Sequence, residues 1–484
     1  MRTLLDRIQA FSRSQPNTEA IVCNGFGLSY SQLNSRVAQV AEELRSLNIS
    51  RLALYASNDL DWVLVDLAAA SADVSVVPIP LFFSREQREH LLDNSGVDAV
   101  YCGQGTLSLD GQVLASNLLP GHYRRLSTPA ADQRADFNKI TYTSGSTGTP
   151  KGACLSGDTL MTIVSSLASA LEPSGLSRHL CLLPFATLLE NVAGIYLPLW
   201  MGRSLVIEEN ERLGLLSNHT FDPALFCDAV ARHGIESVIL LPQMLKLLIE
   251  QGDISALSSL KFIAVGGGKV PPEQLQEAIR LKLPVFEGYG LTECGSCVAL
   301  NTPGNSRIGS VGKPLHHANV RISNSGEILV TGAAMNGYLD HEQATQEIAT
   351  GDAGFIDDDG FLYITGRIKN TIISSFGRNI SPEWVESMFL AEPEIQQLAV
   401  FGEGAPSLSA VLYAQPSVSD QRLREVIAKV NSTLPDYAQL TAWHRSANPF
   451  SVESGTLTAN GKLCRGGIAT TYAGHLALAL KAVA

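Results

Sequence analysis

The chain carries the segment Tyr142-Thr-Ser-Gly-Ser-Thr-Gly-Thr-Pro-Lys-Gly152, which consists almost entirely of glycine, hydroxyl-bearing residues, proline and lysine. Such a composition suits a tight loop, because glycine lets the backbone approach a ligand while amides, hydroxyls and an ammonium group bind phosphate. A strand is expected to end at Tyr142, which is a usual place for a phosphate loop to begin. The candidate phosphate-binding residues are Thr143, Ser144, Gly145, Ser146, Thr147, Gly148, Thr149 and Lys151.

This segment is not a Walker A loop, since Pro150 stands where that pattern requires glycine before the lysine. A flexible Ser/Gly linker is the alternative, but linkers rarely combine Pro, Lys and flanking hydrophobic residues in this order. The segment closely resembles the signature loop of the adenylate-forming superfamily, which includes acyl-CoA synthetases, aryl-CoA ligases, luciferases and peptide-synthetase adenylation domains. The resemblance implies that the loop wraps the β- and γ-phosphates of ATP.

A second motif, Glu287-Gly-Tyr-Gly-Leu-Thr-Glu-Cys294, places an aromatic ring between two glycines and ends in a carboxylate. Glycine backbone can lie against a flat ligand, and a carboxylate oxygen suits Mg²⁺. The motif resembles the second core motif of the same superfamily. That resemblance implies that Tyr289 stacks on adenine, that Thr292 touches the α-phosphate and that Glu293 holds the metal. The flanking nucleotide-binding residues are Gly288 and Gly290.

Further matches lie downstream in the order that the superfamily requires. Asp352 follows a glycine in an expected turn, and Arg367 comes fifteen residues later. Both match positions that hold the ribose. Lys369 falls where the superfamily has its inter-domain hinge, and a hinge residue must change its backbone angles while staying solvated. Gly377 matches the glycine that lies beside the pantetheine channel during thioester formation.

Leu457-Thr-Ala-Asn-Gly-Lys462 resembles the last superfamily motif, whose lysine is catalytic. When a carboxylate attacks an α-phosphate, two anions approach each other, and an ammonium group between them offsets their repulsion. The resemblance implies two half-reactions. A carboxylic acid and Mg-ATP first give acyl-adenylate and pyrophosphate, and a thiol then displaces AMP. Lys462 is expected to serve the first half-reaction and to be withdrawn for the second by movement of a C-terminal domain.

The candidate acyl pocket follows Leu183-Pro-Phe, where amino-acid-activating relatives place an Asp that pairs with the substrate ammonium. Here that position is Ala186, so an α-amino acid would bury an unpaired charge. Thr187 replaces a frequent His or aromatic residue. Glu190 is either a pocket residue or a helix-face residue paired with an Arg. The remaining candidate pocket residues, chosen because they suit an apolar acyl chain, are Gly194, Gly266, Gly267 and Gly268.

Strand-like and helix-like runs alternate through most of the 484 residues, which predicts an α/β class with parallel strands. The chain exceeds one ordinary core, so at least two domains are expected. We expect a large N-terminal domain of α/β subdomains at 1–368, which binds ATP and the acyl group. A small, mobile α+β C-terminal domain at 369–484 would carry the catalytic lysine. Ser381-Pro382 has the pattern of a helix start, with Ser at the N-cap.

The formal net charge of −12 and the lack of basic runs argue against nucleic acid as a partner. The eight cysteines are scattered, as in a reduced cytosolic protein, and neither a signal peptide nor a transmembrane segment is expected. We therefore expect a cytoplasmic enzyme that uses ATP, Mg²⁺ and CoA, acting on a small-molecule carboxylic acid.

The favoured substrate is a medium- or long-chain fatty acid, because the second motif and residues 450–458 look most like fatty acyl-CoA synthetases. Three alternatives are an aryl-acid CoA ligase, a ligase that loads the phosphopantetheine thiol of an acyl carrier protein, and one that uses an amine acceptor. A nucleotide-binding scaffold without turnover is disfavoured, because Glu293 and Lys462 are both present.

Overall fold

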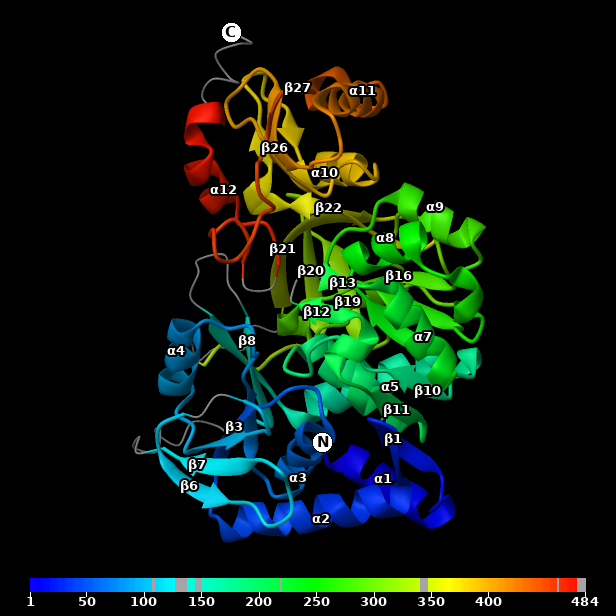
Figure 1. Cartoon of the computed structure of the whole chain (residues 1–484), viewed down its shortest axis with the longest axis vertical. Coiled ribbons are helices and arrows are strands. Elements are labelled where there is room, and N and C mark those ends of the chain that lie inside the picture. The colour runs from blue at the N-terminus through cyan, green and yellow to red at the C-terminus, as the bar shows by residue number, and fades with distance from the viewer. Residues whose placement is uncertain are drawn as a thin grey trace.

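The computed structural model describes residues 1–106, 109–126, 137–143, 150–217, 220–339, 347–458 and 461–476. The candidate phosphate-binding residues from Ser144 to Thr149 lie outside the described residues. Figure 1 shows the C-terminal elements, drawn in orange and red, stacked above the rest of the chain.

The first sheet has a parallel centre, formed by β5, β3, β4 and β8, and antiparallel strands at both edges. Its strands lie in the order β6-β7-β5-β3-β4-β8-β9. Their bounds are β3 (Arg51–Tyr55), β4 (Ser75–Pro78), β5 (Ala99–Cys102), β6 (Gln112–Ala115), β7 (His122–Arg125), β8 (Lys139–Thr143) and β9 (Lys151–Leu155). Because β8 and β9 pair antiparallel, they bring the two ends of the phosphate-loop segment side by side, with Thr143 opposite Lys151.

The second sheet runs in the order β18-β17-β16-β15-β14-β10-β11-β1-β2, and its central strands are parallel. Its strands are β1 (Glu19–Cys23), β2 (Phe26–Ser29), β10 (Arg178–Leu180), β11 (Ser204–Ile207), β14 (Ser237–Leu240), β15 (Phe262–Val265), β16 (Val285–Tyr289), β17 (Ala299–Leu300) and β18 (Lys313–Pro314). One face packs on α7 (Pro223–His233), α8 (Pro242–Gln251) and α9 (Pro272–Arg280). Near-continuous apolar strands such as Ser237-Val-Ile-Leu240 are typical of a sheet that is covered on both faces.

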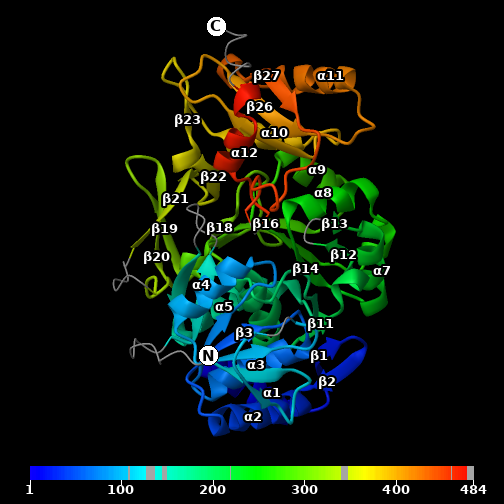
Figure 2. The same cartoon turned by 60° about the vertical axis from the view of Figure 1, so that its left-hand side comes forward.

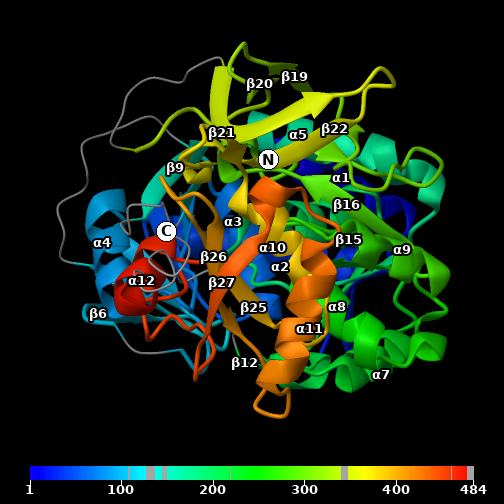
Figure 3. The ribbon, with the colours of Figure 1, turned by 90° about the horizontal axis from the view of Figure 1, so that it is seen from above.

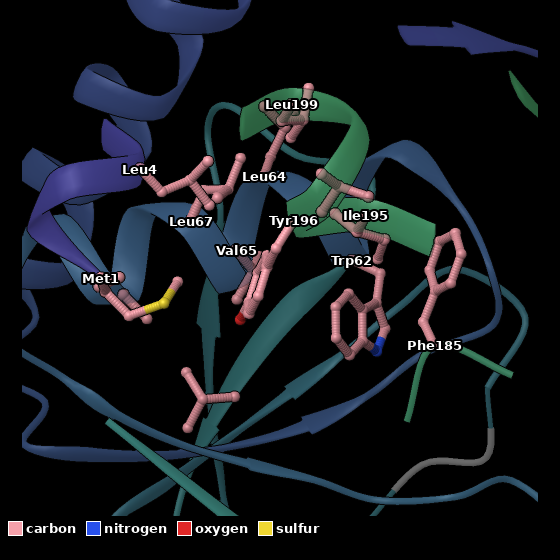
Figure 4. Close-up of a cluster of buried hydrophobic side chains, with 14 of the residues drawn as sticks. Met1, Leu4, Trp62, Leu64, Val65, Leu67, Phe185, Ile195, Tyr196 and Leu199 are labelled. Carbon is pink, nitrogen blue, oxygen red and sulfur yellow. The ribbon is translucent and has the colours of Figure 1, made fainter. Parts of the chain in front are cut away.

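A layer of helices fills the space between the two sheets, and one apolar core joins all three layers. Its elements are α1 (Arg2–Ser14), α2 (Tyr30–Ser46), α3 (Leu60–Ser71), α5 (Gly157–Leu171), the π-helix η2 (Glu190–Tyr196) and α6 (Leu197–Trp200). Figure 4 shows part of this core, where Trp62 of α3 lies beside Phe185, with ring centroids 5.4 Å apart. Phe185 belongs to the candidate acyl motif, so the core fixes one wall of the pocket.

A buried polar network crosses this apolar core. Lys139, the first residue of β8, donates hydrogen bonds to Asp66 Oδ1 (2.7 Å), Asn191 Oδ1 (2.5 Å) and Tyr196 Oη (2.7 Å). Tyr196 in turn donates to Asp66 Oδ2 at 2.6 Å, so the ion pair is enclosed by hydrogen bonds. A buried charge is tolerated only when it is paired in this way.

A small sheet and the C-terminal domain follow the two large sheets along the chain. The small antiparallel sheet contains β19 (Ala318–Ile322), β20 (Glu327–Gly332), β21 (Glu347–Ile356) and β22 (Leu362–Arg367). The C-terminal domain has its own core, formed by α10 (Pro382–Leu390), β25 (Gln397–Phe401), β26 (Leu408–Tyr413), α11 (Asp420–Asn431) and β27 (Leu440–Arg445). Figure 2 shows this domain above the larger one, and Figure 3 shows it from above, overlying the larger domain.

The predicted α/β class, with a large N-terminal and a smaller C-terminal domain, is confirmed. Ser381 caps α10 by accepting a hydrogen bond from the Trp384 amide, as its sequence pattern predicts. The expected turn around Asp352 is wrong, because this residue lies inside β21. Gly351 has a φ of +70° there, and the register of the β21–β22 pair shifts after Ala353. Among the described residues, the structure contains no helix with the length and apolar character needed to cross a membrane.

The buried ion pair generates a prediction for stability. Lys139→Met should lower the free energy of unfolding by about 3–5 kcal/mol, because the Asp66 charge loses its partner in an apolar core. Denaturant unfolding measures this change. Lys261→Met is the matched control. It removes a half-exposed lysine that lies 2.7 Å from Glu236, and it should cost at most about 1 kcal/mol. Equal losses in the two variants would contradict the structural role of Lys139.

Candidate active site

A cleft of about 2980 Å³ lies between the strand ends of the large domain and the C-terminal domain. Sites for single small molecules usually measure about 300–1,000 Å³, so this cleft has room for several ligands. The sequence-predicted residues that line it are Thr143, Lys151, Ala186, Thr187, Gly266, Gly267, Gly268, Gly288, Tyr289, Gly290, Thr292, Glu293, Asp352, Arg367, Lys369 and Lys462. Motifs that are far apart in the sequence therefore meet at one place.

Asp352 and Arg367 are direct cross-strand partners on β21 and β22. Arg367 Nε lies 2.8 Å from Asp352 Oδ1, and the Tyr289 hydroxyl donates to Asp352 Oδ2 at 2.6 Å. Burial raises the pKa of Asp352, while the Tyr289 hydrogen bond and Arg367 oppose that rise. The structure thus joins two of the predicted nucleotide-binding motifs through one carboxylate, which is suited to accept hydroxyl hydrogen bonds.

Glu293 and Lys151 meet through Tyr338, a residue that the sequence analysis does not identify. The Tyr338 hydroxyl donates to Glu293 Oε1 at 2.5 Å, and Lys151 Nζ lies 5.7 Å from the centroid of the Tyr338 ring. The Met335 amide also donates to the Glu293 carbonyl at 2.7 Å. These contacts hold the Glu293 carboxylate at the cleft, next to the strand that follows the phosphate-loop segment.

Lys462 comes from the C-terminal domain and reaches the same part of the cleft. Its backbone pairs with Thr458, whose amide donates to the Lys462 carbonyl at 2.7 Å. The cleft walls exclude part of the water, which lowers the pKa of the Lys462 ammonium. Arg367 lowers it further, while Asp352 and Glu293 raise it. Lys462 therefore lines the cleft together with the carboxylates of both motifs, and the residue as a whole is exposed.

The glycines of the second motif serve packing as well as ligand approach. A Cβ on Gly290 would lie 2.0 Å from the Ser296 carbonyl oxygen, so any side chain there would displace backbone. A Cβ on Gly288 would lie 3.0 Å from a Leu300 methyl group. The protein's own chain therefore requires glycine at position 290, and the role of Gly290 toward a ligand stays a prediction.

The acyl end of the cleft follows the face of the second sheet that points toward α5 and α6. Because side chains alternate along strands, Gly266, Ala264 and Phe262 all lie on this face. The distance from Gly266 to Phe262 is about 13 Å at the usual rise per residue. Neighbouring positions on β14 and apolar residues of the helix layer complete this part of the lining, namely Leu167, Leu171, Ala193, Leu197, Ile239 and Leu241. This pocket is mostly apolar along its length.

Two polar residues, His179 and Ser237, lie at the far end of this pocket in the same row as Phe262. His179 Nδ1 and Ser237 Oγ share a hydrogen bond of 3.0 Å. Behind them, the fully buried Glu190 accepts a hydrogen bond from the Leu182 amide at 3.1 Å, and His179 Nε2 lies 3.8 Å from Glu190 Oε1. The end of the pocket is therefore polar while its walls are apolar.

Of the sequence-predicted site residues that the structure describes, three do not line the cleft. Glu190 is buried beside His179 at the start of the π-helix. It therefore neither lines the pocket nor pairs with an Arg, which were the two expectations. Gly194 faces Glu190, since a Cβ there would lie 2.5 Å from Glu190 Oε1. Gly377 lies in an exposed turn with a φ of +71°, between the short strands β23 (Ile372–Ile373) and β24 (Asn379–Ile380).

Glu287 opens the second motif, and no role for it follows from the sequence. Its side chain is buried in the cleft wall, and the Val270 amide donates to Oε1 at 3.4 Å. Oε2 has no hydrogen-bond partner among the described residues. Burial raises the pKa of Glu287 to about 8, while the Val270 amide and Lys269 oppose that rise. A buried carboxyl group that retains its proton near neutral pH can donate a hydrogen bond to a ligand.

Comparison with known proteins agrees with this geometry. Residues 8–339 match the AMP-binding enzyme family, and residues 369–482 match the AMP-binding enzyme C-terminal domain. The chain is 27% identical to a 2-succinylbenzoate–CoA ligase of Bacillus cereus over 430 residues, covering 83% of this chain and 86% of that protein.

Two solved structures have a similar fold. The o-succinylbenzoate CoA synthetase of Bacillus subtilis in complex with its acyl-adenylate intermediate has a TM-score of 0.78 and 23% identity, covering 96% of this chain and 97% of that one. An anthranilate CoA ligase in complex with anthranoyl-AMP has a TM-score of 0.80 and 19% identity, covering 99% and 98%.

The chain belongs to the AMP-binding enzyme family, which forms part of the adenylate-forming superfamily. It is an acid–thiol ligase of the AMP-forming class.

The shifted pKa of Glu287 generates a prediction. Between pH 4.5 and about pH 8, the Glu287 side chain is deprotonated in the unfolded chain but still protonated in the folded chain. The contribution of Glu287 to the free energy of unfolding therefore falls as the pH rises through this range. Glu287→Gln should remove the effect. The free energy of unfolding of Glu287→Gln minus that of the unsubstituted protein should increase from pH 5 to pH 8, by up to roughly 4 kcal/mol. Denaturant unfolding at several pH values tests this, with Glu273→Gln on the exposed side of α9 as control. A difference that is constant with pH would be the contrary result.

Proposed function

We propose that the enzyme joins an apolar carboxylic acid to CoA, and that an aromatic acid is the first candidate. The observation that carries this proposal is the position of Lys462. It lines the same cleft as Asp352 and Glu293, whose charges raise the pKa of its ammonium group. The family membership supplies the reaction class, and the pocket supplies the class of acid.

In the first half-reaction, a carboxylate oxygen of the acid attacks the α-phosphorus of ATP. The new O–P bond forms as the bond to pyrophosphate breaks, which gives acyl-adenylate. Asp352 accepts hydrogen bonds from the ribose hydroxyls, and Thr292 contacts the α-phosphate. The Lys462 ammonium lies between the two anions and offsets the charge that develops on the phosphoryl oxygens.

Magnesium fits the chemistry of these residues. Glu293 offers a carboxylate at the cleft, held in place by Tyr338, and hard oxygen donors are the ligands that Mg²⁺ prefers. Bound there with ATP, the ion would neutralise phosphate charge. Lys151 and the phosphate-loop segment would bind the β- and γ-phosphates from the other side.

The second half-reaction requires a different arrangement. A thiol attacks the acyl carbonyl, its proton is lost to solvent, and AMP leaves as the thioester forms. Gly377, the residue expected beside the pantetheine channel, lies in an exposed turn away from the cleft. We therefore propose that the C-terminal domain rotates about Lys369 between the half-reactions, which withdraws Lys462 and brings Gly377 to the site. The proposed domain boundary is this same residue.

The lining of the pocket supports an apolar acid. Ala186 lines it where an α-amino acid would need a carboxylate partner, and burying an ammonium unpaired is costly. The named relatives act on 2-succinylbenzoate and anthranilate, which favours an aromatic acid. A medium- or long-chain fatty acid is the second candidate, because the apolar wall continues for about 13 Å beyond Gly266.

The test is pyrophosphate release over a panel of aromatic, fatty and amino acids, each with and without CoA. We expect release with apolar acids and formation of the corresponding acyl-CoA, detected by mass spectrometry. An aromatic acid should give the highest kcat/KM, whereas a maximum among fatty acids would select the second candidate. Release of pyrophosphate without any acyl-CoA would contradict CoA as acceptor and point to a carrier-protein thiol or an amine.

A further inference from the structure

A lysine of the large domain, Lys246 on α8, crosses the cleft and binds the C-terminal domain. Its Nζ donates hydrogen bonds to the carbonyl oxygens of Leu390 (2.7 Å), Glu392 (3.0 Å) and Ile395 (3.1 Å). These carbonyls belong to the last residue of α10 and to the segment that follows it. An ammonium group has three N–H donors, and here all three have acceptors.

One of the acceptors, the carbonyl of Leu390 at the last residue of α10, has a physical reason to attract a cation. The last carbonyl groups of a helix lack intrahelical partners, and the helix dipole places partial negative charge at this end. Lysine side chains near a helix C-terminus can satisfy such groups. The lysine that does so here comes from the other domain rather than from α10 itself. The contact therefore joins two domains instead of capping a helix locally.

The same helix leads back to the catalytic lysine. Glu386 of α10 forms an ion pair with Arg465, with Oε1 2.6 Å from Nη1 and Oε2 2.8 Å from Nη2. Arg465 lies three residues after Lys462, and it also donates to the Val400 carbonyl at 3.2 Å. A continuous series of contacts thus connects Lys246 to α10, α10 to Arg465, and Arg465 to the turn that carries Lys462.

We propose that Lys246 is a positioning residue for adenylation: by holding the C-terminal end of α10, it keeps Lys462 in the cleft during the first half-reaction. This inference rests on the proposed function, because it assumes that one domain position serves adenylation and another serves thioester formation. When the C-terminal domain rotates, the hydrogen bonds of Lys246 must break. Lys246 therefore sets the balance between the two half-reactions without touching either substrate.

The experiment compares the two half-reactions in Lys246→Met, which retains the apolar stem of the side chain and removes the ammonium group. Acid-dependent pyrophosphate exchange should fall about tenfold through kcat, with the KM for ATP little changed. Thioester formation from supplied acyl-adenylate and CoA should be unchanged or faster. Lys246→Arg retains a cation of similar reach and should recover most of the exchange rate.

Lys429→Met is the matched control. Lys429 Nζ lies 2.8 Å from Glu392 Oε1, so it contacts the same segment as Lys246 but from within the C-terminal domain. This variant should leave the ratio of the two half-reactions unchanged. A shift of that ratio in Lys429→Met equal to the shift in Lys246→Met would overturn the proposal, since any loss of charge near Glu392 would then suffice.

Two further outcomes would overturn it. Equal losses in both half-reactions would mean that Lys246 only stabilises the fold, and unchanged rates would mean that the contact does not position Lys462. Small-angle X-ray scattering gives a readout that does not depend on activity. Lys246→Met should shift the scattering profile toward a more open arrangement of the domains, and an unchanged profile would contradict the proposal. Absence of exchange in the unsubstituted protein with every acid would instead refute the proposed function, leaving the scattering result to decide the role of Lys246.

Discussion

The buried ion pair of Lys139 and Asp66 is the constraint on which the arrangement of the site depends. Lys139 begins β8, the strand that runs directly into the phosphate-loop segment, while Asp66 lies on α3 in the helix layer. Asn191 and Tyr196 of the π-helix complete the network, and the same π-helix follows the acyl motif. The network therefore fixes the position of β8, which leads into the phosphate-loop segment, relative to the π-helix, which follows the candidate acyl motif. An apolar pair of similar size could fill this space, but it would lack the directional hydrogen bonds and the charge attraction that position these two segments.

The second constraint is that one cleft must serve two reactions that need different groups. The candidate nucleotide-binding residues Tyr289, Asp352 and Arg367 lie on β16, β21 and β22, so in the proposed mechanism they stay in place when the C-terminal domain moves. Lys462 and Gly377 belong to the C-terminal domain but lie in different places on it, one in the cleft and the other in an exposed turn. The hydrogen bonds of Lys246 to the C-terminal domain must break for these two residues to exchange places. A large apolar interface would oppose that exchange.

The sequence predicts much of the fold, because buried parallel strands and amphipathic helices leave distinct patterns. It also identifies residues that belong to compact motifs, such as Tyr289 and Glu293. Residues that act through contacts across the chain leave no such signal. Tyr338 meets Glu293 only when the short 3-10 helix Thr292–Cys294 and the segment after β20 are brought together, and Arg465 meets Glu386 only in the folded C-terminal domain. Asp352 was expected in a turn because it follows a glycine, whereas its pairing with Arg367 places it in a strand.

We propose that Lys462 acts in adenylation and not in thioester formation. The most direct test is to measure both half-reactions in Lys462→Ala. Acid-dependent pyrophosphate exchange should fall by at least about a hundredfold, which matches the usual effect of removing one group that stabilises transition-state charge. Conversion of supplied acyl-adenylate and CoA to acyl-CoA should stay within about twofold of the unsubstituted rate. Equal loss of both half-reactions, or retention of the exchange, would contradict the assignment of Lys462.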